Sequence, residues 1–309
     1  MNLDMWDEAA GPIHRPLRMR HRFARHSGAI RHQYPQRWRP GKLDEEVIVK
    51  VMSLHSQQEI AEFLRRNSFL HLYSLGDLDD FFWPYTTWYA LKDHQQIKQL
   101  ALLYTGTPLP ILLGLTEEPT DQMRELLQSI LHLLPTRLYT HLSGDLSTVF
   151  AGNYHIHSHG AHYKMGLIHK AQVETIDTAQ VEPLSSLDVD ELEALYRLSY
   201  PGNWFDPRML ETGCYYGIRH EKELVSVAGI HVYSPHYQVA ALGNVTTHPA
   251  YRGQGLATVV CAKLCQSLLQ TVDYIGLNVK ADNVGAIRCY ERLGFEYVAT
   301  YEECALERK

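Results

Sequence analysis

The sequence lacks any long apolar run. Its longest uninterrupted apolar stretches, such as Ile111 to Leu115, are far shorter than the roughly 20 residues that a helix needs to span a bilayer. No segment resembles a secretory leader, and no transmembrane helix is expected. The absence of both favours a soluble, globular protein of the cytoplasm.

Cysteines are few, and they show no metal-ligand spacing. Their number is odd, so they do not form a complete disulfide framework. We expect no metal site and a reducing compartment. The five are Cys214, Cys261, Cys265, Cys289 and Cys304.

Acidic residues are missing from residues 11–42, which carry nine Arg or Lys and four His. The rest of the chain has an acidic excess, which argues against a nucleic-acid-binding main domain, because phosphate contacts need a basic face. We predict that residues 1–45 form a basic, disordered arm. It could be a solvated tail, an arm for nucleic acid or a membrane surface, or upstream sequence from a misplaced start.

The length of 309 residues favours two domains, and 45% hydrophobic residues suffice for a core in each. We place the first domain at residues 46–170. Ser56 and Glu59 have the spacing of a capping box and predict a helix start. β-like runs at 99–104 and 110–115, a helix from about Thr120, and alternating runs at 137–142 and 154–167 follow.

The second domain is predicted at residues 171–309 and repeats this order. Asp188 and Glu191 form a capping pair before a helix. Strands follow at 215–219, 224–233 and 238–247, then a helix at 255–270, a strand at 274–279, a helix at 283–292 and a strand at 296–306. Similar order without obvious sequence identity predicts a degenerate tandem repeat.

The segment HPAYRGQGLA, residues 248–257, joins the predicted strand 238–247 to the helix after it. A glycine-bearing turn that opens a helix exposes backbone N–H groups at the positive end of the helix dipole. Gly253 and Gly255 would let an anion approach these groups, and Arg252 adds a positive charge. The segment alone is a weak signal, because an ordinary turn has the same composition.

A second block, ADNVGAIRCYERLGF, places Asn283, Ala286, Tyr290, Gly294 and Phe295 at fixed spacing. With both blocks, the chain resembles the GNAT superfamily of acyl-CoA-dependent N-acyltransferases, in particular members with a tandem arrangement like that of the glycine N-acyltransferases. The resemblance covers roughly residues 215–300. It implies an α/β (α+β) GNAT fold, a mixed and mostly antiparallel sheet flanked by helices, with two tandem halves of which the first is degenerate.

The resemblance also implies which residues bind the coenzyme. The segment 252–257 would hold the pyrophosphate of coenzyme A, and the strand before it would splay from its neighbour and pair with the pantetheine arm. The N–H of Val245 would face the thioester carbonyl. The residues implied in binding are Val245, Thr246, Thr247, Arg252, Gly253, Gln254, Gly255, Leu256, Ala257, Asn283, Ala286 and Tyr290. Asn283 would also cap its helix.

Tyr290 matches the tyrosine that protonates the departing thiolate in this family. The glutamate that often serves as base in the family is replaced by Ala241. His231 is the candidate base that we name, with water-mediated deprotonation equally open. His236, Asp206 and Glu211 are further candidates.

Two segments outside the matching blocks bear on the acceptor. SYPGNWFDP, residues 199–207, offers Trp204 and Phe205 as apolar surface for an acceptor pocket or as an interdomain contact. In the first half, TEEPTDQM at residues 116–123 stands where the glycine turn would be. Its acids would repel a pyrophosphate, so the first half is expected to bind no coenzyme A.

The sequence therefore predicts an N-acetyltransferase that uses acetyl-CoA and no metal, and that transfers the acetyl group directly to the primary amine of a small molecule or amino acid. A non-catalytic acyl-CoA-binding regulatory module and a protein N-acetyltransferase are the alternatives. We expect no membrane partner and no nucleic-acid partner except through the basic arm. A homodimer is possible.

Overall fold

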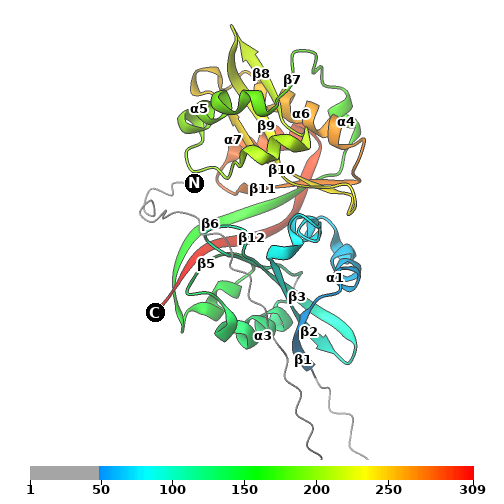
Figure 1. Ribbon diagram of the computed structural model, residues 1–309, viewed down its shortest axis with the longest axis vertical. Coiled ribbons are helices and arrows are strands. Elements are labelled where there is room, and N and C mark those ends of the chain that lie inside the picture. The colour runs from blue at the N-terminus through cyan, green and yellow to red at the C-terminus, as the bar shows by residue number, and fades with distance from the viewer. Residues whose placement is uncertain (1–48, 118) are drawn as a thin grey trace, which may run out of the picture.

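The computed structural model describes residues 49–117 and 119–309. The predicted arm, residues 1–45, lies outside them. The described chain forms one twelve-stranded sheet with the order β1-β2-β3-β4-β5-β12-β6-β11-β10-β9-β8-β7, and helices flank it (Figure 1). Strand pairs are antiparallel except β4 with β5 and β10 with β11. The predicted fold class, a mixed and mostly antiparallel sheet flanked by helices, is confirmed.

The first half supplies the strands at one end of this sheet. Its helix α3 buries Met123, Leu126, Leu127 and Ile130, the predicted apolar face. The elements are β1 (Val49–Leu54), α1 (Gln57–Leu64), η1 (Arg65–Asn67), α2 (Leu72–Gly76), η2 (Trp83–Tyr85), β2 (Thr86–Asp93), β3 (Gln96–Tyr104), β4 (Ile111–Gly114), α3 (Asp121–Ile130), η3 (Leu131–Leu133), β5 (Arg137–Ser143), η4 (Leu146–Phe150) and β6 (Tyr154–Leu167).

The second half follows the predicted order of elements to within a few residues at each boundary. The short helix α4, the short strand β7 and the 3-10 helices are additions to it. The elements are α4 (Ala171–Glu174), β7 (Glu182–Pro183), η5 (Ser186–Asp188), α5 (Val189–Ser199), η6 (Pro207–Thr212), β8 (Tyr216–His220), β9 (Glu223–Ser234), β10 (Val239–Thr247), η7 (Pro249–Tyr251), α6 (Leu256–Leu268), β11 (Tyr274–Lys280), α7 (Val284–Arg292) and β12 (Phe295–Arg308).

The two halves exchange their last strands. β6 ends the first half but pairs with β11 of the second, and β12 ends the second half but pairs with β5 of the first. The two strands also pair with each other over almost their whole length, and both cross from one lobe to the other (Figure 1). Neither half therefore completes its sheet alone, and the boundary at residue 170 stays a prediction.

Two helix starts differ from expectation. Ser56 accepts a hydrogen bond from the Glu59 N–H at 3.2 Å, but the Glu59 carboxylate pairs with Lys92 instead of reaching back. Asp188 stands at the predicted N-cap position of α5, but its side chain makes no capping hydrogen bond there. The capping box lies one turn earlier, at the start of η5, where Ser185 is the cap and Asp188 accepts the Ser185 N–H at 2.8 Å. The Asp188 carboxylate is bonded to the Ser185 N–H in this capping box and therefore does not cap α5.

The sheet of the second half has two apolar faces. Ala240 and Leu242 belong to the core formed with α6 and α7, whereas Val239 and Ala241 belong to the core formed with α1 and α2 of the first half. Successive residues of a strand point to opposite faces, so the first half covers one face of the second half's sheet. Among the helices that the structure describes, none is long and apolar enough to cross a membrane.

Candidate functional site

β10 and β11 run side by side and then part. Their parallel pairing covers residues 239–242 of β10 and 274–277 of β11. On its other side, the pairing of β10 with β9 shifts register after Gly243, so Val245 has no partner in either neighbouring strand. Bulges of this kind re-aim backbone groups and end strand pairing beside many active sites. Residues 243–247 therefore leave one edge of β10 open toward β11.

Asn244 holds this bulge in place. Its φ of 54° lies in the left-handed region, which asparagine adopts more readily than most residues. Its side-chain Nδ2 donates to the Tyr215 hydroxyl at 2.9 Å and to the Trp204 carbonyl at 3.1 Å, and its backbone carbonyl accepts the Tyr196 hydroxyl at 3.0 Å. Asn244 is 2% exposed and is absent from the residues predicted from sequence. A lone asparagine in an apolar strand is the signal that points to it.

Asn244→Ala is expected to lower the free energy of unfolding by about 2–4 kcal/mol, because it leaves buried polar partners unpaired and places alanine in the left-handed region. Urea unfolding monitored by circular dichroism measures the loss. Asn244→Gly removes the same hydrogen bonds but tolerates the backbone conformation, so we expect it to lose less. Wild-type stability in both variants would contradict this role for Asn244.

The turn before α6 presents unpaired amides. Gly253 and Gly255 have φ values of 79° and 82°, and residues 252–255 are exposed. The backbone N–H groups of residues 253–258 have no hydrogen-bond acceptor among residues 49–117 and 119–309. They lie at the N-terminal end of a thirteen-residue helix, where the partial positive charge of the helix dipole is concentrated. This arrangement can bind a phosphate group.

Arg252 ties the same turn to two other elements. Its Nε donates to the Thr247 carbonyl at 3.1 Å, and one Nη donates to the Ser199 carbonyl at the end of α5 at 3.2 Å. The Thr246 hydroxyl donates to the Ser199 hydroxyl at 3.2 Å. The positive charge predicted beside the turn is present, and it also fixes the turn against the open end of β10. The Thr247 carbonyl is thereby already engaged.

Tyr290 lies on α7 and is 8% exposed. Its hydroxyl makes no hydrogen bond to any residue in the described part of the chain. Burial, together with the neighbouring groups of Cys261, Cys289, Tyr200 and Tyr73, holds the pKa of Tyr290 well above its ordinary value. The phenol therefore keeps its proton at neutral pH and is free to donate it.

Asn283 caps α7, as predicted, with its Oδ1 accepting the Ala286 N–H at 3.2 Å. Cys289 on the same helix is buried, and its sulfur lies 3.3 Å from the Thr258 hydroxyl of α6. All five cysteines are buried and free. Among the residues that the structure describes, no group of three or more His, Cys, Asp or Glu is placed to hold a metal ion.

His231, the candidate base, packs its ring over Gly243, where an added Cβ would meet it at 2.3 Å. Its Nε2 lies 3.3 Å from the Asn244 Oδ1. Because that oxygen can only accept, Nε2 carries the proton and Nδ1 keeps a free lone pair. Burial lowers the pKa of His231 against the raising effect of this hydrogen bond, so the ring is neutral at pH 7. The structure thus brings His231 beside the open segment of β10.

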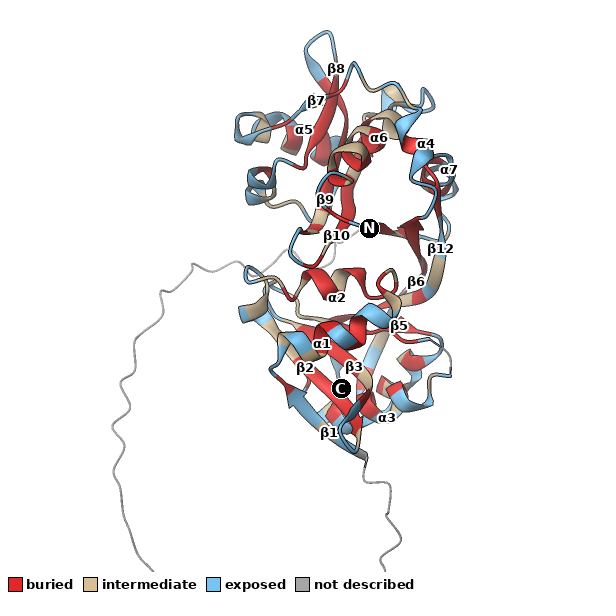
Figure 2. Ribbon diagram, turned by 90° about the vertical axis from the view of Figure 1, so that its right-hand side faces the viewer, coloured by how far each residue is buried: buried red, intermediate tan, exposed pale blue. Residues whose placement is uncertain are grey.

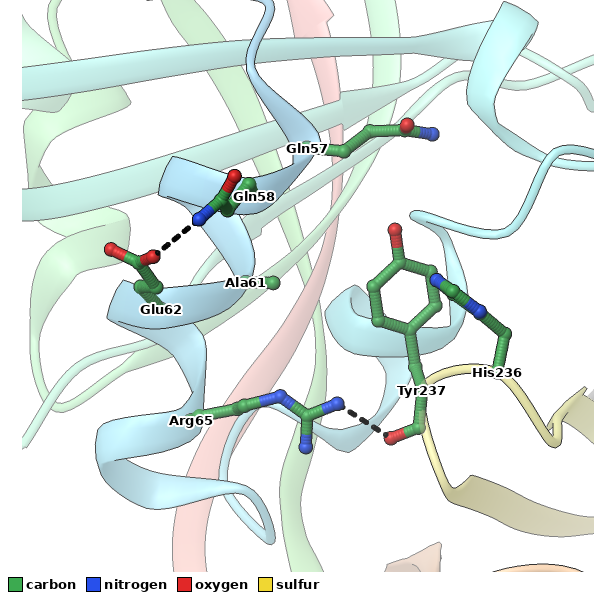
Figure 3. Close-up of a pocket in the computed structure, with 7 residues that line it drawn as sticks. All are labelled: Gln57, Gln58, Ala61, Glu62, Arg65, His236 and Tyr237. Atoms are coloured by element: carbon green, nitrogen blue, oxygen red, sulfur yellow. Dashed lines mark hydrogen bonds between the residues drawn. The ribbon is translucent and has the colours of Figure 1, made fainter.

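The other candidate bases lie on other elements. His236 lines a pocket of about 370 Å³ at the end of β10 remote from residues 243–247. Figure 3 shows this pocket between α1 and the turn after β9, where Arg65 donates to the Tyr237 carbonyl at 3.2 Å. The remaining lining residues of the pocket are Gln57, Gln58, Ala61 and Glu62.

Asp206 forms an ion pair with Arg208 at 2.6 Å. Its charge contributes to raising the pKa of Tyr215, whose hydroxyl accepts from Asn244. Glu211 is an exposed residue of η6.

Ala241 is fully buried in the core with Leu72 and Leu75 of α2. A glutamate at this position would have to push its carboxylate into that apolar contact, which is unfavourable without a partner. The missing family glutamate therefore has a physical reason, because α2 of the first half occupies the space that its side chain would need.

The matching turn of the first half has a different chemistry. β4 and β5 also form a parallel pair, over residues 111–114 and 139–142. A pocket of about 570 Å³ at the end of this pair is lined by residues that include Glu117 and Glu302. Carboxylates here would repel a pyrophosphate.

Comparison with known proteins agrees with this geometry. Residues 181–295 match the model of the acetyltransferase (GNAT) family. No curated protein sequence matches the chain. Many solved structures resemble it.

A Drosophila protein is 11% identical with a TM-score of 0.61, and the match covers 84% of this chain and 99% of that one. A GCN5-related N-acetyltransferase from Sphaerobacter thermophilus is 11% identical with a TM-score of 0.54, covering 84% and 96%. A tandem GNAT protein from the clavulanic acid biosynthesis pathway is 14% identical with a TM-score of 0.51, covering 84% and 98%. At these identities the likeness shows the fold. The family match and the shared fold together establish that residues 181–295 form a domain of the GNAT acetyltransferase family.

Proposed function

We propose that the protein is an N-acetyltransferase that moves the acetyl group of acetyl-CoA to the primary amine of a small molecule. The observation that carries the proposal is the row of unpaired amides at residues 253–258, one short turn after the open edge of β10. The unpaired amides are suited to a diphosphate, and the open strand edge is suited to the amide-rich pantetheine arm.

In this proposal the diphosphate of coenzyme A binds the turn, and the pantetheine arm lies along the open edge toward α7. Arg252 fixes the turn and contributes its charge. Asn283 and Ala286 at the start of α7 flank the arm. The residues that would contact the coenzyme are Val245, Thr246, Thr247, Arg252, Gly253, Gln254, Gly255, Leu256, Ala257, Asn283, Ala286 and Tyr290.

The chemistry is a direct attack of the amine on the thioester. His231 takes one proton from the ammonium form through Nδ1, and the freed nitrogen lone pair bonds to the carbonyl carbon. Val245, without a strand partner, offers its N–H to the oxygen on which negative charge develops. The carbon–sulfur bond then breaks, Tyr290 gives its proton to the departing sulfur, and the surplus proton on nitrogen returns to Tyr290.

His231→Gln is expected to lower kcat about 100-fold, because glutamine cannot accept the proton. Burial lowers the pKa of His231, so wild-type kcat should fall only below pH 6.5, the ordinary pKa of histidine. The decrease of kcat at acidic pH should be absent in His231→Gln. Stopped assays of coenzyme A thiol release across pH 5–9 measure both. His236→Gln, at the remote end of β10, is the matched control and should match wild type. If His231→Gln kept the wild-type kcat, His231 would not be the base, and deprotonation would take place through water.

Thiol release with a panel of small amines tests the proposal as a whole. Turnover that depends on both acetyl-CoA and the amine supports it. Binding of acetyl-CoA without turnover on any amine would instead favour a regulatory acyl-CoA-binding module, the alternative that the replacement of the family glutamate by Ala241 favours.

We propose that the first half is a degenerate GNAT-like domain, residues 46–170, and that residues 171–309 are the catalytic domain. The resemblance to a described tandem GNAT protein supports this division. If the basic arm instead recruits a protein acceptor, deleting residues 1–45 should abolish activity. A cytoplasmic location and a homodimer stay predictions.

A further inference from the structure

Helix α2 of the first half lies across the sheet of the second half. An added Cβ on Gly276 of β11 would meet Leu72 at 3.0 Å, and one on Gly76 would meet Val232 of β9 at 2.0 Å. Figure 2 shows α2 beneath β9 and β10, on the side of the first half. The helix therefore covers the sheet face opposite α6 and α7, up to the place where β10 and β11 part.

One edge of α2 is polar, and it faces that place. Tyr73 and Asp77 are one helical turn apart and lie on the same side. The Tyr73 ring lies 4.8 Å from Nζ of Lys164, which donates to the Asn278 Oδ1 at 3.2 Å. Asn278 directly follows Leu277, the last residue of β11 that pairs with β10. The polar edge of α2 is thus connected, through Tyr73 and Lys164, to the first residue of β11 beyond its pairing with β10.

Burial raises the pKa of Tyr73 above its usual range, with a hydrogen bond from the Asn278 backbone acting against it. Tyr73 in turn is one of the groups that raise the pKa of Tyr290. Tyr73 and Tyr290 come from different halves of the chain. Through the contacts of Tyr73 with Lys164 and of Lys164 with Asn278, the side of α2 that carries Asp77 faces the place where the pairing of β10 and β11 ends.

Asp77 itself has no partner. Within residues 49–117 and 119–309 its carboxylate makes no hydrogen bond and no ion pair, although it is half-buried. Burial raises the pKa of Asp77 to about 7, with Lys164 acting in the opposite direction. The buried Glu303 is a contrast, because it accepts the Tyr139 and Tyr301 hydroxyls. Neither Asp77 oxygen is among the fully buried side-chain atoms that lack a partner in the described residues. The carboxylate is therefore accessible to a cationic ligand, with which it can form a charge-assisted hydrogen bond.

We propose that Asp77 binds the ammonium group of the acceptor, so that the first half supplies the acceptor site for the acyl-CoA site of the second half. This proposal rests on the N-acetyltransferase function proposed above. It identifies the acceptor as a molecule with a protonated primary amine. A hydroxyl or thiol acceptor would leave the Asp77 charge without compensation. Asp77 holds the nitrogen, and His231 takes its proton.

The test is Asp77→Asn, which keeps the shape of the side chain and removes its charge. KM for the amine should rise about 10- to 100-fold, because a charge-assisted hydrogen bond is lost. kcat should change less than threefold, and the Kd of acetyl-CoA should not change. Asp80→Asn, an exposed neighbour on the same segment, is the matched control and should retain the wild-type KM. An unchanged KM for the amine in Asp77→Asn would overturn the proposal.

Stability gives an independent readout. When folding raises the pKa of an acid, the ionised form is less stable in the folded protein than in the unfolded chain. The free energy of unfolding therefore falls as the pH rises from the unfolded-state pKa to the folded-state pKa, and the full loss is reached above both pKa values. At pH 8, Asp77→Asn should therefore raise the midpoint of thermal unfolding, by about 3–6 °C. A variant that unfolds earlier or fails to fold would show that Asp77 is held by structural partners, and would also overturn the proposal.

Direct binding separates this proposal from the function on which it rests. Benzylamine and benzyl alcohol are titrated calorimetrically into the full chain saturated with coenzyme A, where no turnover is needed. We expect benzylamine to bind wild type at least tenfold more tightly than benzyl alcohol, and we expect Asp77→Asn to lose this preference. Equal binding of the two to wild type, or no binding of benzylamine, would contradict the role of Asp77 whether or not thiol release is observed.

Discussion

Tyr290→Phe is expected to lower kcat for thiol release by about 100- to 1000-fold, the range typical of a lost general acid. The phenol has no hydrogen bond within the described chain and keeps its proton at neutral pH. Phenylalanine retains the ring but cannot protonate the departing sulfur. The KM for acetyl-CoA should stay within threefold of wild type, because the hydroxyl acts on the leaving group. Steady-state kinetics with saturating amine measures both constants.

The control for this variant is Tyr297→Phe. Tyr297 is exposed, and its hydroxyl contacts Glu291 at 3.3 Å. It lies on β12, which β6 and β11 separate from β10 in the sheet. We expect wild-type kinetics from it. If Tyr290→Phe kept its kcat, the thiolate would leave without help from this residue, and the catalytic assignment on α7 would be wrong.

Gly255→Asp is expected to raise the Kd of acetyl-CoA at least 100-fold. The side chain would carry a negative charge into the row of amides that is proposed to receive the diphosphate, and the two anions would repel each other. Aspartate also adopts the φ of 82° less readily than glycine. Isothermal titration of acetyl-CoA into each protein measures the change.

Gly213→Asp separates the effect of the added charge from the effect of backbone strain. Gly213 ends η6 with a φ of 69° and has open space around it, so aspartate is strained there to a similar degree. We expect this control to lose some stability but to bind acetyl-CoA normally. An equal loss of affinity in both variants would mean that Gly255 acts through the fold and not through the anion site.

The parts of the fold that depend on local sequence could be predicted. Periodic apolar residues place α3, β6 and α6 to within a few residues, because one face of each element is buried. The turn at Gly253 and Gly255 could also be predicted, because few residues other than glycine adopt positive φ values.

The parts that depend on contacts between distant segments could not be predicted. Nothing in the sequence of β12 indicates that it pairs with β5, because a strand carries the same alternation whichever partner it has. α2 and most of β2 lie in the aromatic-rich segment 72–91. Its apolar residues contact both halves and so lack a single period. Asp77 could not be found for the same reason, since only the packing of α2 on β9 to β11 brings it to the site.

The most direct test of the account is the response of the backbone amides of residues 253–258 to coenzyme A, followed by amide NMR in the uniformly deuterated protein. We predict large shifts at Gly253 and Gly255 on addition of coenzyme A, and much smaller ones with pantetheine, which lacks the diphosphate. Unchanged signals at both glycines under saturating coenzyme A would show that the diphosphate binds elsewhere.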